Sequence, residues 1–82
     1  MYFVYIVQCA DTTLYTGIAK ELERRVEEHN SSVKGAKYTR ARRPVKLVYS
    51  EEYADRSTAS KREYEIKKKM SRKKKLQLIG LA

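Results

Sequence analysis

The sequence predicts an α+β fold in which a small, three-stranded, mainly antiparallel sheet is flanked by helices. Two short apolar segments stand on either side of a turn-forming stretch near the N-terminus, and a third apolar segment follows later. Segments with helical spacing of their apolar residues lie between and after these strands. The expected element order is β-β-α-β-α-α, and 82 residues fit one domain, residues 1–82, with no room for a second core.

The first two strands are expected to pair as an antiparallel hairpin. Residues 2–7 are apolar on both faces, which is typical of a central strand that is covered on both sides. Residues 10–13 supply turn-forming side chains, and residues 14–18 form the second short strand. Gly17 inside that strand indicates either a bulge or a place where another group approaches the backbone closely.

A helix, a loop and the third strand follow the hairpin. Residues 21–30 have the spacing of a helix, and the basic stretch 31–44 is expected to be a loop. The third strand begins with residues 45–49 and continues towards Tyr53.

Two further helices are expected in the last third of the chain. Asp55 is a suitable N-cap for a helix that continues to about Met70. Ser71 can cap a third, short helix that ends near Gly80. The lysine runs 67–69 and 73–75 then lie within helices.

The net charge of +9 is unevenly distributed along the chain. Residues 1–33 carry three basic and five acidic side chains, a sum of −2, so the rest of the chain carries +11. Such an asymmetry indicates a polyanionic partner. Nucleic acid, an anionic membrane and ribosomal RNA all fit that description.

The sequence favours a cytoplasmic location without a membrane partner. No segment approaches the length of a transmembrane helix. The N-terminal apolar run lacks a basic leader, so it is interpreted as a strand rather than a signal peptide. Cys9, the single cysteine, suits a reducing compartment and is expected to be a small buried apolar residue.

Helical geometry gives the two adjacent arginines of the first helix different positions. At about 100° per residue, His29 falls on the buried stripe and Arg25 lies at its rim, one turn away. Arg24 points towards solvent, together with Glu27 and Glu28. Arg25 is therefore expected to reach into a pocket, and Arg24 to be a surface charge.

The second helix places a carboxylate on an apolar face. Ala59, Ile66 and Met70 share that face, and Glu63 lies in its middle. A carboxylate there is costly unless it meets a cation or hydrogen-bond donors. One interpretation is a structural ion pair, for instance with Arg25, and the other is a metal ligand or an acid/base group.

Tyrosines supply the remaining candidates, since the chain has seven of them and no tryptophan. Tyr5 and Tyr15 come from the two strands of the hairpin. A single strand tyrosine is most often a core residue with its hydroxyl at the edge. The convergence of two phenols with Arg25, His29 and Glu63 favours a functional site.

Several blocks of the sequence resemble the GIY-YIG nuclease family, over essentially the whole chain. The triplet Val4-Tyr5-Ile6, which keeps the tyrosine of the signature, and the later Tyr15-Thr16-Gly17 are similar to its two-part signature. The later blocks that resemble the family are residues 22–30, 35–40, 43–45 and 59–63. The resemblance is to short stand-alone bacterial members, which are related to the nuclease subunit of eukaryotic structure-specific endonucleases.

The resemblance implies a metal-dependent endonuclease that hydrolyses phosphodiester bonds in DNA, including branched or damaged structures. It implies that Tyr5, Tyr15, Arg25 and His29 form the catalytic centre and that Glu63 binds one divalent ion, Mg²⁺ or Mn²⁺. Tyr5 would accept the proton of the attacking water, for which it needs nearby cations or a proton relay to His29. The assignment of the base between the two tyrosines stays open.

Basic residues supply the expected nucleic-acid surface, although any one of them is about as often a solvated charge. The candidates are Lys37, Tyr38, Arg40, Arg42, Arg43, Lys67 and Lys68. Few side chains look able to read bases, so recognition of the backbone or of shape is expected. Two alternatives to a free-standing enzyme stay open. One is a non-catalytic nucleic-acid-binding module, and the other is a nuclease subunit that cuts only when a protein partner supplies the substrate.

Overall fold

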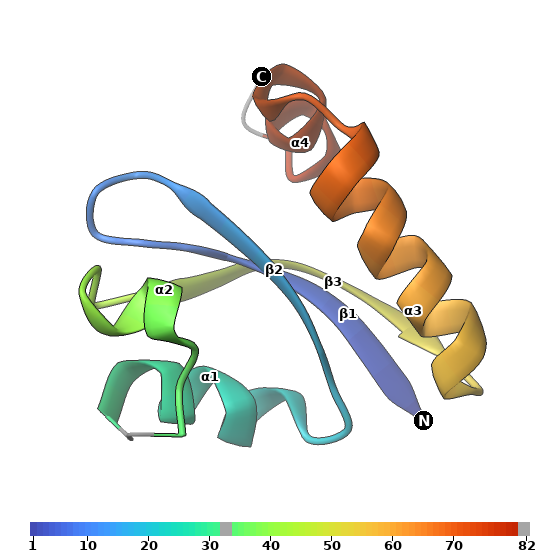
Figure 1. Cartoon of the computed structure of the whole chain (residues 1–82), viewed down its shortest axis with the longest axis horizontal. Helices are drawn as coiled ribbons and strands as arrows, with labels where there is room; N and C mark the ends of the chain where they lie inside the picture. The colour runs from blue at the N-terminus through green and yellow to red at the C-terminus, as the bar shows by residue number, and fades with distance from the viewer. Residues whose placement is uncertain (32–33, 81–82) are drawn as a thin grey trace.

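A three-stranded sheet with helices on both faces forms the protein, as Figure 1 shows. The computed structural model describes residues 1–31 and 34–80. The strand order is β2-β1-β3, and both outer strands run antiparallel to β1. The elements are β1 (Tyr2–Gln8), β2 (Leu14–Ala19), α1 (Leu22–Ser31), α2 (Lys37–Arg40), β3 (Lys46–Tyr53), α3 (Arg56–Tyr64), the π-helix η1 (Glu65–Lys69) and α4 (Arg72–Leu78).

The central strand β1 contributes to two separate cores because its side chains alternate between the faces of the sheet. Val4 and Ile6 pack with residues of α3 and η1 on one face. Tyr5 and Val7 face the other way and pack with residues of α1. Figure 1 shows the same division, with α1 and α2 on one side of the sheet and α3 and α4 on the other. The two-sided burial predicted for this strand is confirmed.

The ends of the predicted strands and helices agree with the structure to within about two residues, except that the second predicted helix changes from the α-helix α3 to the π-helix η1 at Glu65. Both predicted caps are formed: the Asp55 carboxylate accepts from the Thr58 N–H at 2.8 Å, and the Ser71 hydroxyl from the Lys74 N–H at 3.2 Å. Cys9 is buried, as expected, with 4% of its surface exposed.

The expectation of an unbroken loop over residues 31–44 is wrong for its central part. Lys37–Arg40 form the single helical turn α2, which begins after the extended residue Ala36. One turn contains too few residues to show a helical period, so the pattern gave no signal. Residues 32 and 33 of this stretch lie outside the described residues.

None of the helices in residues 1–31 and 34–80 combines the length and the apolar character needed to cross a bilayer.

Candidate active site

Tyr5 is the centre of the candidate site, and Gly17 makes room for it. The two residues face each other across the β1–β2 ladder. A Cβ atom on Gly17 would lie 2.5 Å from the Tyr5 hydroxyl oxygen and 2.7 Å from its Cζ atom. The phenol ring therefore lies directly over the backbone of the edge strand, where any side chain would displace it. This is the close approach that a glycine inside the strand indicated.

His29 connects Tyr5 to the short helix α2. It is completely buried, with its Nε2 atom 2.7 Å from the Tyr5 hydroxyl and its Nδ1 atom 2.8 Å from the hydroxyl of Thr39. The backbone N–H of Ala36 donates to the same Nδ1 atom at 3.4 Å. The Tyr15 ring meets the imidazole edge-on, with 5.2 Å between ring centroids. His29 thus contacts both of the predicted catalytic tyrosines.

Thr39 is a member of this cluster that sequence reasoning missed. It is fully buried, although it lies in a stretch that reads as a basic loop. Its contact with His29 joins residues ten apart across a segment without a recognisable period. The sequence carries no local signal for a buried hydroxyl at this position.

Burial sets the charge state of the cluster. Burial lowers the pKa of His29 to about 4; the positive charges of Arg25 and Arg43 act in the same direction, and Glu28 opposes them. Burial raises the pKa of Tyr5 to about 12, even though the Arg25 guanidinium beside it lowers that pKa. At neutral pH the imidazole is therefore neutral and Tyr5 is a phenol.

The two adjacent arginines differ as the helical geometry predicted. The Arg25 side chain is 27% exposed, against 67% for Arg24. Arg25 donates to the Glu28 carboxylate at 3.0 Å and to the Lys34 carbonyl at 2.8 Å, beside the Tyr5 ring. Arg24 forms ion pairs with Glu21 at 3.2 Å and with Glu28 at 3.7 Å.

The expectation that Glu28 faces solvent is wrong. Its side chain is 21% exposed and its carboxylate lies within ion-pair distance of both Arg24 and Arg25. Residues three and four apart on a helix are neighbours, so the two cations draw the carboxylate against the helix surface. Arg24 and Arg25 therefore share one anion, although they differ in exposure.

Glu63 approaches the tyrosines from the other side of the sheet. Its negative charge contributes to the raised pKa of both Tyr5 and Tyr15, after burial as the largest cause. Since α1 and α3 cover opposite faces, the charge of Glu63 acts on these tyrosines from the face opposite to α1. In the part of the chain that the structure describes, no hydrogen bond or ion pair reaches the half-buried Glu63 carboxylate. The structural ion pair with Arg25 is not formed.

The donor set fits a hard cation that keeps most of its water. Within residues 1–31 and 34–80, no group of three or more His, Cys, Asp or Glu side chains could enclose a metal ion. Mg²⁺ is commonly held by one or two carboxylates, with water and substrate phosphate as its other ligands. A half-buried carboxylate without a protein partner, as at Glu63, satisfies that requirement.

The predicted nucleic-acid residues of the basic segment fall into two groups. Lys37, Tyr38 and Arg40 are exposed. Arg42 is held in place by an ion pair with Asp11 at 3.1 Å, and its guanidinium lies 4.0 Å from the centroid of the Tyr38 ring.

Arg43 is tied to the end of α1, because it donates to the carbonyl of His29 at 2.6 Å. Arg42 and Arg43 therefore help to position the segment that carries Thr39.

Two lysines of η1 are exposed but differ in their distance from the site. The Lys67 ammonium lies over the ring of Tyr15, 5.5 Å from its centroid. Lys68 is exposed and has no such ring contact among the described residues. A π-helix is rare and often marks a functional segment, and here it carries Lys67 on the next turn after Glu63.

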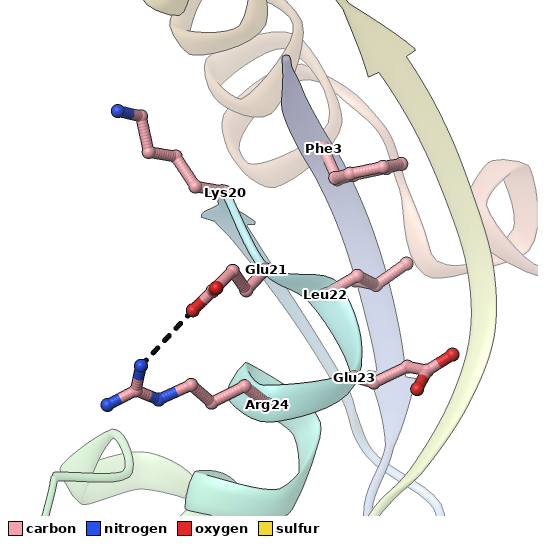
Figure 2. Close-up of a pocket in the computed structure, with 6 residues that line it drawn as sticks. All are labelled: Phe3, Lys20, Glu21, Leu22, Glu23 and Arg24. Atoms are coloured by element: carbon pink, nitrogen blue, oxygen red, sulfur yellow. Dashed lines mark hydrogen bonds and ion pairs between the residues drawn. The ribbon is translucent and has the colours of Figure 1, made fainter.

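A groove borders the site at Arg25. A hollow of about 240 Å³ lies between the end of β2 and α1, with Arg25 and Glu28 in its wall. It shares three lining residues with a larger hollow of about 640 Å³ at the start of α1. Figure 2 shows that Phe3 and Leu22 point the same way in the larger hollow, while the paired Glu21 and Arg24 lie on its other side. Tyr5 and His29 do not line either hollow.

Comparison with known proteins identifies the class to which this arrangement belongs. Residues 1–77 match the GIY-YIG catalytic domain, so the chain belongs to the GIY-YIG family.

Relatives in that family are UPF0213 proteins. A UPF0213 protein of Desulfotalea psychrophila is 71% identical over 66 residues, which cover 80% of this chain and 60% of that protein. A UPF0213 protein of Staphylococcus aureus is 60% identical over 78 residues, which cover 95% of this chain and 93% of that protein.

Solved structures show the same fold. The solution NMR structure of a UPF0213 protein from Bacillus halodurans is 44% identical, covers 99% of this chain and 85% of its own, and has a TM-score of 0.61. A second solution NMR structure, of a protein from E. faecalis, is 42% identical, covers 93% of this chain and 79% of its own, and also has a TM-score of 0.61. The expected family and fold are confirmed.

Proposed function

We propose that this protein is an endonuclease that hydrolyses phosphodiester bonds in DNA with the help of one divalent ion, Mg²⁺ or Mn²⁺. The observation that carries the proposal is the carboxylate of Glu63, which has no partner within residues 1–31 and 34–80 and acts on the same two tyrosines that contact His29. A domain built only for binding would gain nothing from a half-buried negative charge beside a DNA backbone. The match to a catalytic domain over residues 1–77 supports a hydrolytic role.

Each residue of the cluster then has a role that its position allows. Arg25 borders the open groove and holds a nonbridging phosphate oxygen, where it counters the charge that builds up in the transition state. Tyr5 accepts the proton of the attacking water, and Tyr15, at the edge of the sheet, orients the phosphate. Glu63 would hold the divalent ion, which supplies Lewis-acid stabilisation of the phosphate and of the leaving oxygen.

Burial of Tyr5 makes the nearby positive charge necessary. A phenol with a pKa of about 12 is almost entirely protonated at neutral pH. The Arg25 guanidinium already lowers that pKa, and a cation held at Glu63 would lower it further by the same Coulomb attraction. The ion would therefore have to be in place before Tyr5 becomes an effective base.

The substrate is expected to be held by its backbone. The exposed side chains of Lys37, Arg40 and Lys68, together with Lys67 beside Tyr15, supply positive charge around the site. Such contacts position a nucleic acid without reading its sequence. Branched or damaged DNA is therefore a better candidate substrate than a defined base sequence.

The test incubates the purified chain with labelled duplex, single-stranded and branched DNA and with RNA, in Mg²⁺, Mn²⁺ or EDTA. The Glu63→Gln variant, purified in the same way, controls for contaminating nuclease. The proposal expects metal-dependent cleavage of at least one DNA by the wild type and none by the variant. Binding without cleavage in every metal would instead indicate a non-catalytic module, and cleavage that appears only with an added protein would indicate a partner-dependent subunit.

A further inference from the structure

The hydrogen bond between Tyr5 and His29 can run in either direction, and the direction decides what His29 does. A neutral imidazole carries one proton, on either Nδ1 or Nε2. With the proton on Nδ1, the Nε2 atom accepts from the Tyr5 hydroxyl at 2.7 Å. With the proton on Nε2, His29 is the donor to the same oxygen. The groups around Nδ1 distinguish the two cases.

The backbone N–H of Ala36 is a fixed donor that points at Nδ1, 3.4 Å away. A backbone N–H lies in its peptide plane and cannot rotate away, unlike a hydroxyl. Within the described residues this N–H has no other hydrogen-bond acceptor. A proton on Nδ1 would face the hydrogen of Ala36 and leave that partly buried N–H without an acceptor, which is rare in native structures.

The hydroxyl of Thr39 can adapt to this arrangement. It lies 2.8 Å from Nδ1 and 2.9 Å from the carbonyl oxygen of Ala36, and its single hydrogen can be donated to either. The Ala36 carbonyl already accepts from the N–H groups of Thr39 at 3.0 Å and Arg40 at 3.1 Å. The hydroxyl is therefore free to donate to Nδ1, which then accepts from both Thr39 and Ala36.

We propose that the Ala36 N–H and the Thr39 hydroxyl hold His29 with its proton on Nε2, so that His29 donates to the Tyr5 oxygen. Thr39 is then a positioning residue, which acts on Tyr5 through His29. His29 stabilises the negatively charged form of Tyr5 by a hydrogen bond, and the phenol proton passes to water rather than to His29. The tautomer itself does not depend on hydrolysis, but its use in catalysis rests on the proposed function.

This arrangement agrees with the charges around the imidazole. Burial, together with Arg25 and Arg43, keeps the pKa of His29 low, at about 4, against the opposing charge of Glu28. A relay that moved the Tyr5 proton to such a weak base would be strongly uphill, since burial also raises the pKa of Tyr5 to about 12. A donor at Nε2 avoids that transfer, and Arg25 adds a second donor, which is positively charged, beside the same oxygen.

The chain is well suited to a direct test because His29 is its only histidine. Long-range proton–nitrogen correlation spectra of the full ¹⁵N-labelled chain, recorded at pH 7, contain one imidazole. The proposal expects a protonated Nε2 resonance and an unprotonated Nδ1 resonance. A protonated Nδ1 resonance would overturn the proposal.

Substitutions at Thr39 test the positioning role. Thr39→Val should shift the Nδ1 resonance and lower kcat about five- to tenfold, as expected for one lost hydrogen bond, with KM unchanged. Thr39→Ser should restore both. Thr58 occupies the same third position in α3 and is exposed, so Thr58→Val should leave the imidazole spectrum and kcat unchanged. Equal spectra for wild type and Thr39→Val would contradict the role of Thr39.

The spectra also separate this inference from the proposed function. A protonated Nε2 atom in a chain that cleaves no nucleic acid would leave the tautomer standing and overturn the nuclease. A protonated Nδ1 atom in a chain that does cleave DNA would overturn the tautomer and leave the nuclease standing.

Discussion

Two half-buried carboxylates, Glu51 on β3 and Glu63 on α3, differ in the hydrogen-bond donors that surround them. Each oxygen of Glu51 has two donors: Oε1 accepts from Tyr53 at 2.5 Å and from Arg62 at 2.8 Å, and Oε2 from Tyr49 and from Arg62 at 2.9 Å. Among the residues that the structure describes, Glu63 has none. A carboxylate whose oxygens have hydrogen-bond donors stabilises the fold, whereas a carboxylate without donors is available to bind an ion or to act in catalysis.

The first carboxylate also positions the second. The bidentate pair between Arg62 and Glu51 fixes α3 against β3. Glu63 is the next residue, about 100° further round the helix, so it is turned away from β3 and towards β2. The same comparison applies to the tyrosines: Tyr49 and Tyr53 donate to a carboxylate, whereas the hydroxyl of Tyr5 lies beside His29 and Arg25.

The largest expected effect is on cleavage by Glu63→Gln. The substitution keeps volume and shape but removes the anionic ligand, so cleavage in Mg²⁺ should fall by about two to three orders of magnitude. Single-turnover cleavage of the preferred DNA measures the change. Activity within a few-fold of wild type would show that Glu63 is not needed for chemistry.

Substitutions of Arg25 and Arg24 should differ almost as much in their effect on cleavage. Arg25→Ala should lower cleavage about a hundredfold or more with little loss of DNA binding, because its contact matters most in the transition state. Arg24→Ala, the matched change at the exposed neighbour, should be nearly silent. Cleavage rates and DNA affinity measured side by side check this, and equal effects would remove the distinction between the two faces of α1.

Glu51→Gln should damage the fold rather than the chemistry. It removes the bidentate, charged partner of Arg62 on β3 and leaves only the more exposed ion pair with Glu65 among the described residues, which should cost about 2–3 kcal/mol of unfolding free energy. Chemical denaturation of wild type and variant measures the cost. Cleavage per folded molecule should fall much less than in Glu63→Gln, and a stable but inactive variant would contradict the division of roles.

The protonation of Glu51 should also set part of the pH dependence of stability. Burial alone would raise the pKa of Glu51, but hydrogen bonds from Arg62, Tyr49 and Tyr53 lower it from 4.5 to about 2. Its contribution is therefore fully present above about pH 4.5 and is lost as the pH falls through 2. The stability difference between wild type and Glu51→Gln should shrink over that range, as denaturation at several pH values can show.

Substitutions of Lys67 and Lys68 should show the smallest difference in their effect on cleavage. Each Lys→Gln change removes one charge, so each that contacts duplex DNA should reduce the salt slope of log affinity by roughly 0.9. The Lys67 substitution should in addition lower cleavage about fivefold, the size of the cation–π contact that Lys67 makes with Tyr15. Identical cleavage by the two variants would show that Lys67 contributes to DNA binding alone, as Lys68 does.

Much of the fold could be predicted because its signals are local. The hairpin, both caps and the two-sided core of β1 follow from alternation and from residue types. The helix α2 could not be predicted, since it is a single turn.

The site was predictable in part. Gly17 in a strand and Glu63 on an apolar face conflict with their local patterns, and both conflicts marked positions at the site. Thr39 and the pair between Glu51 and Arg62 gave no such signal, because their partners are distant and each residue suits its own element. The direction in which Glu28 points depended on two neighbouring cations rather than on the helical period.

Thermal unfolding of wild type, Glu63→Gln and Glu51→Gln in EDTA, repeated with Mg²⁺, tests most directly whether Glu63 is kept for chemistry. Without metal, Glu63→Gln should unfold at the wild-type temperature or above it, because an unpaired negative charge has left a partly dry site. Glu51→Gln should unfold about 10–20 °C lower, in line with its cost in free energy. Mg²⁺ should raise the unfolding temperature of wild type but not that of Glu63→Gln. A large, metal-independent drop for Glu63→Gln would show that Glu63 is a structural carboxylate like Glu51.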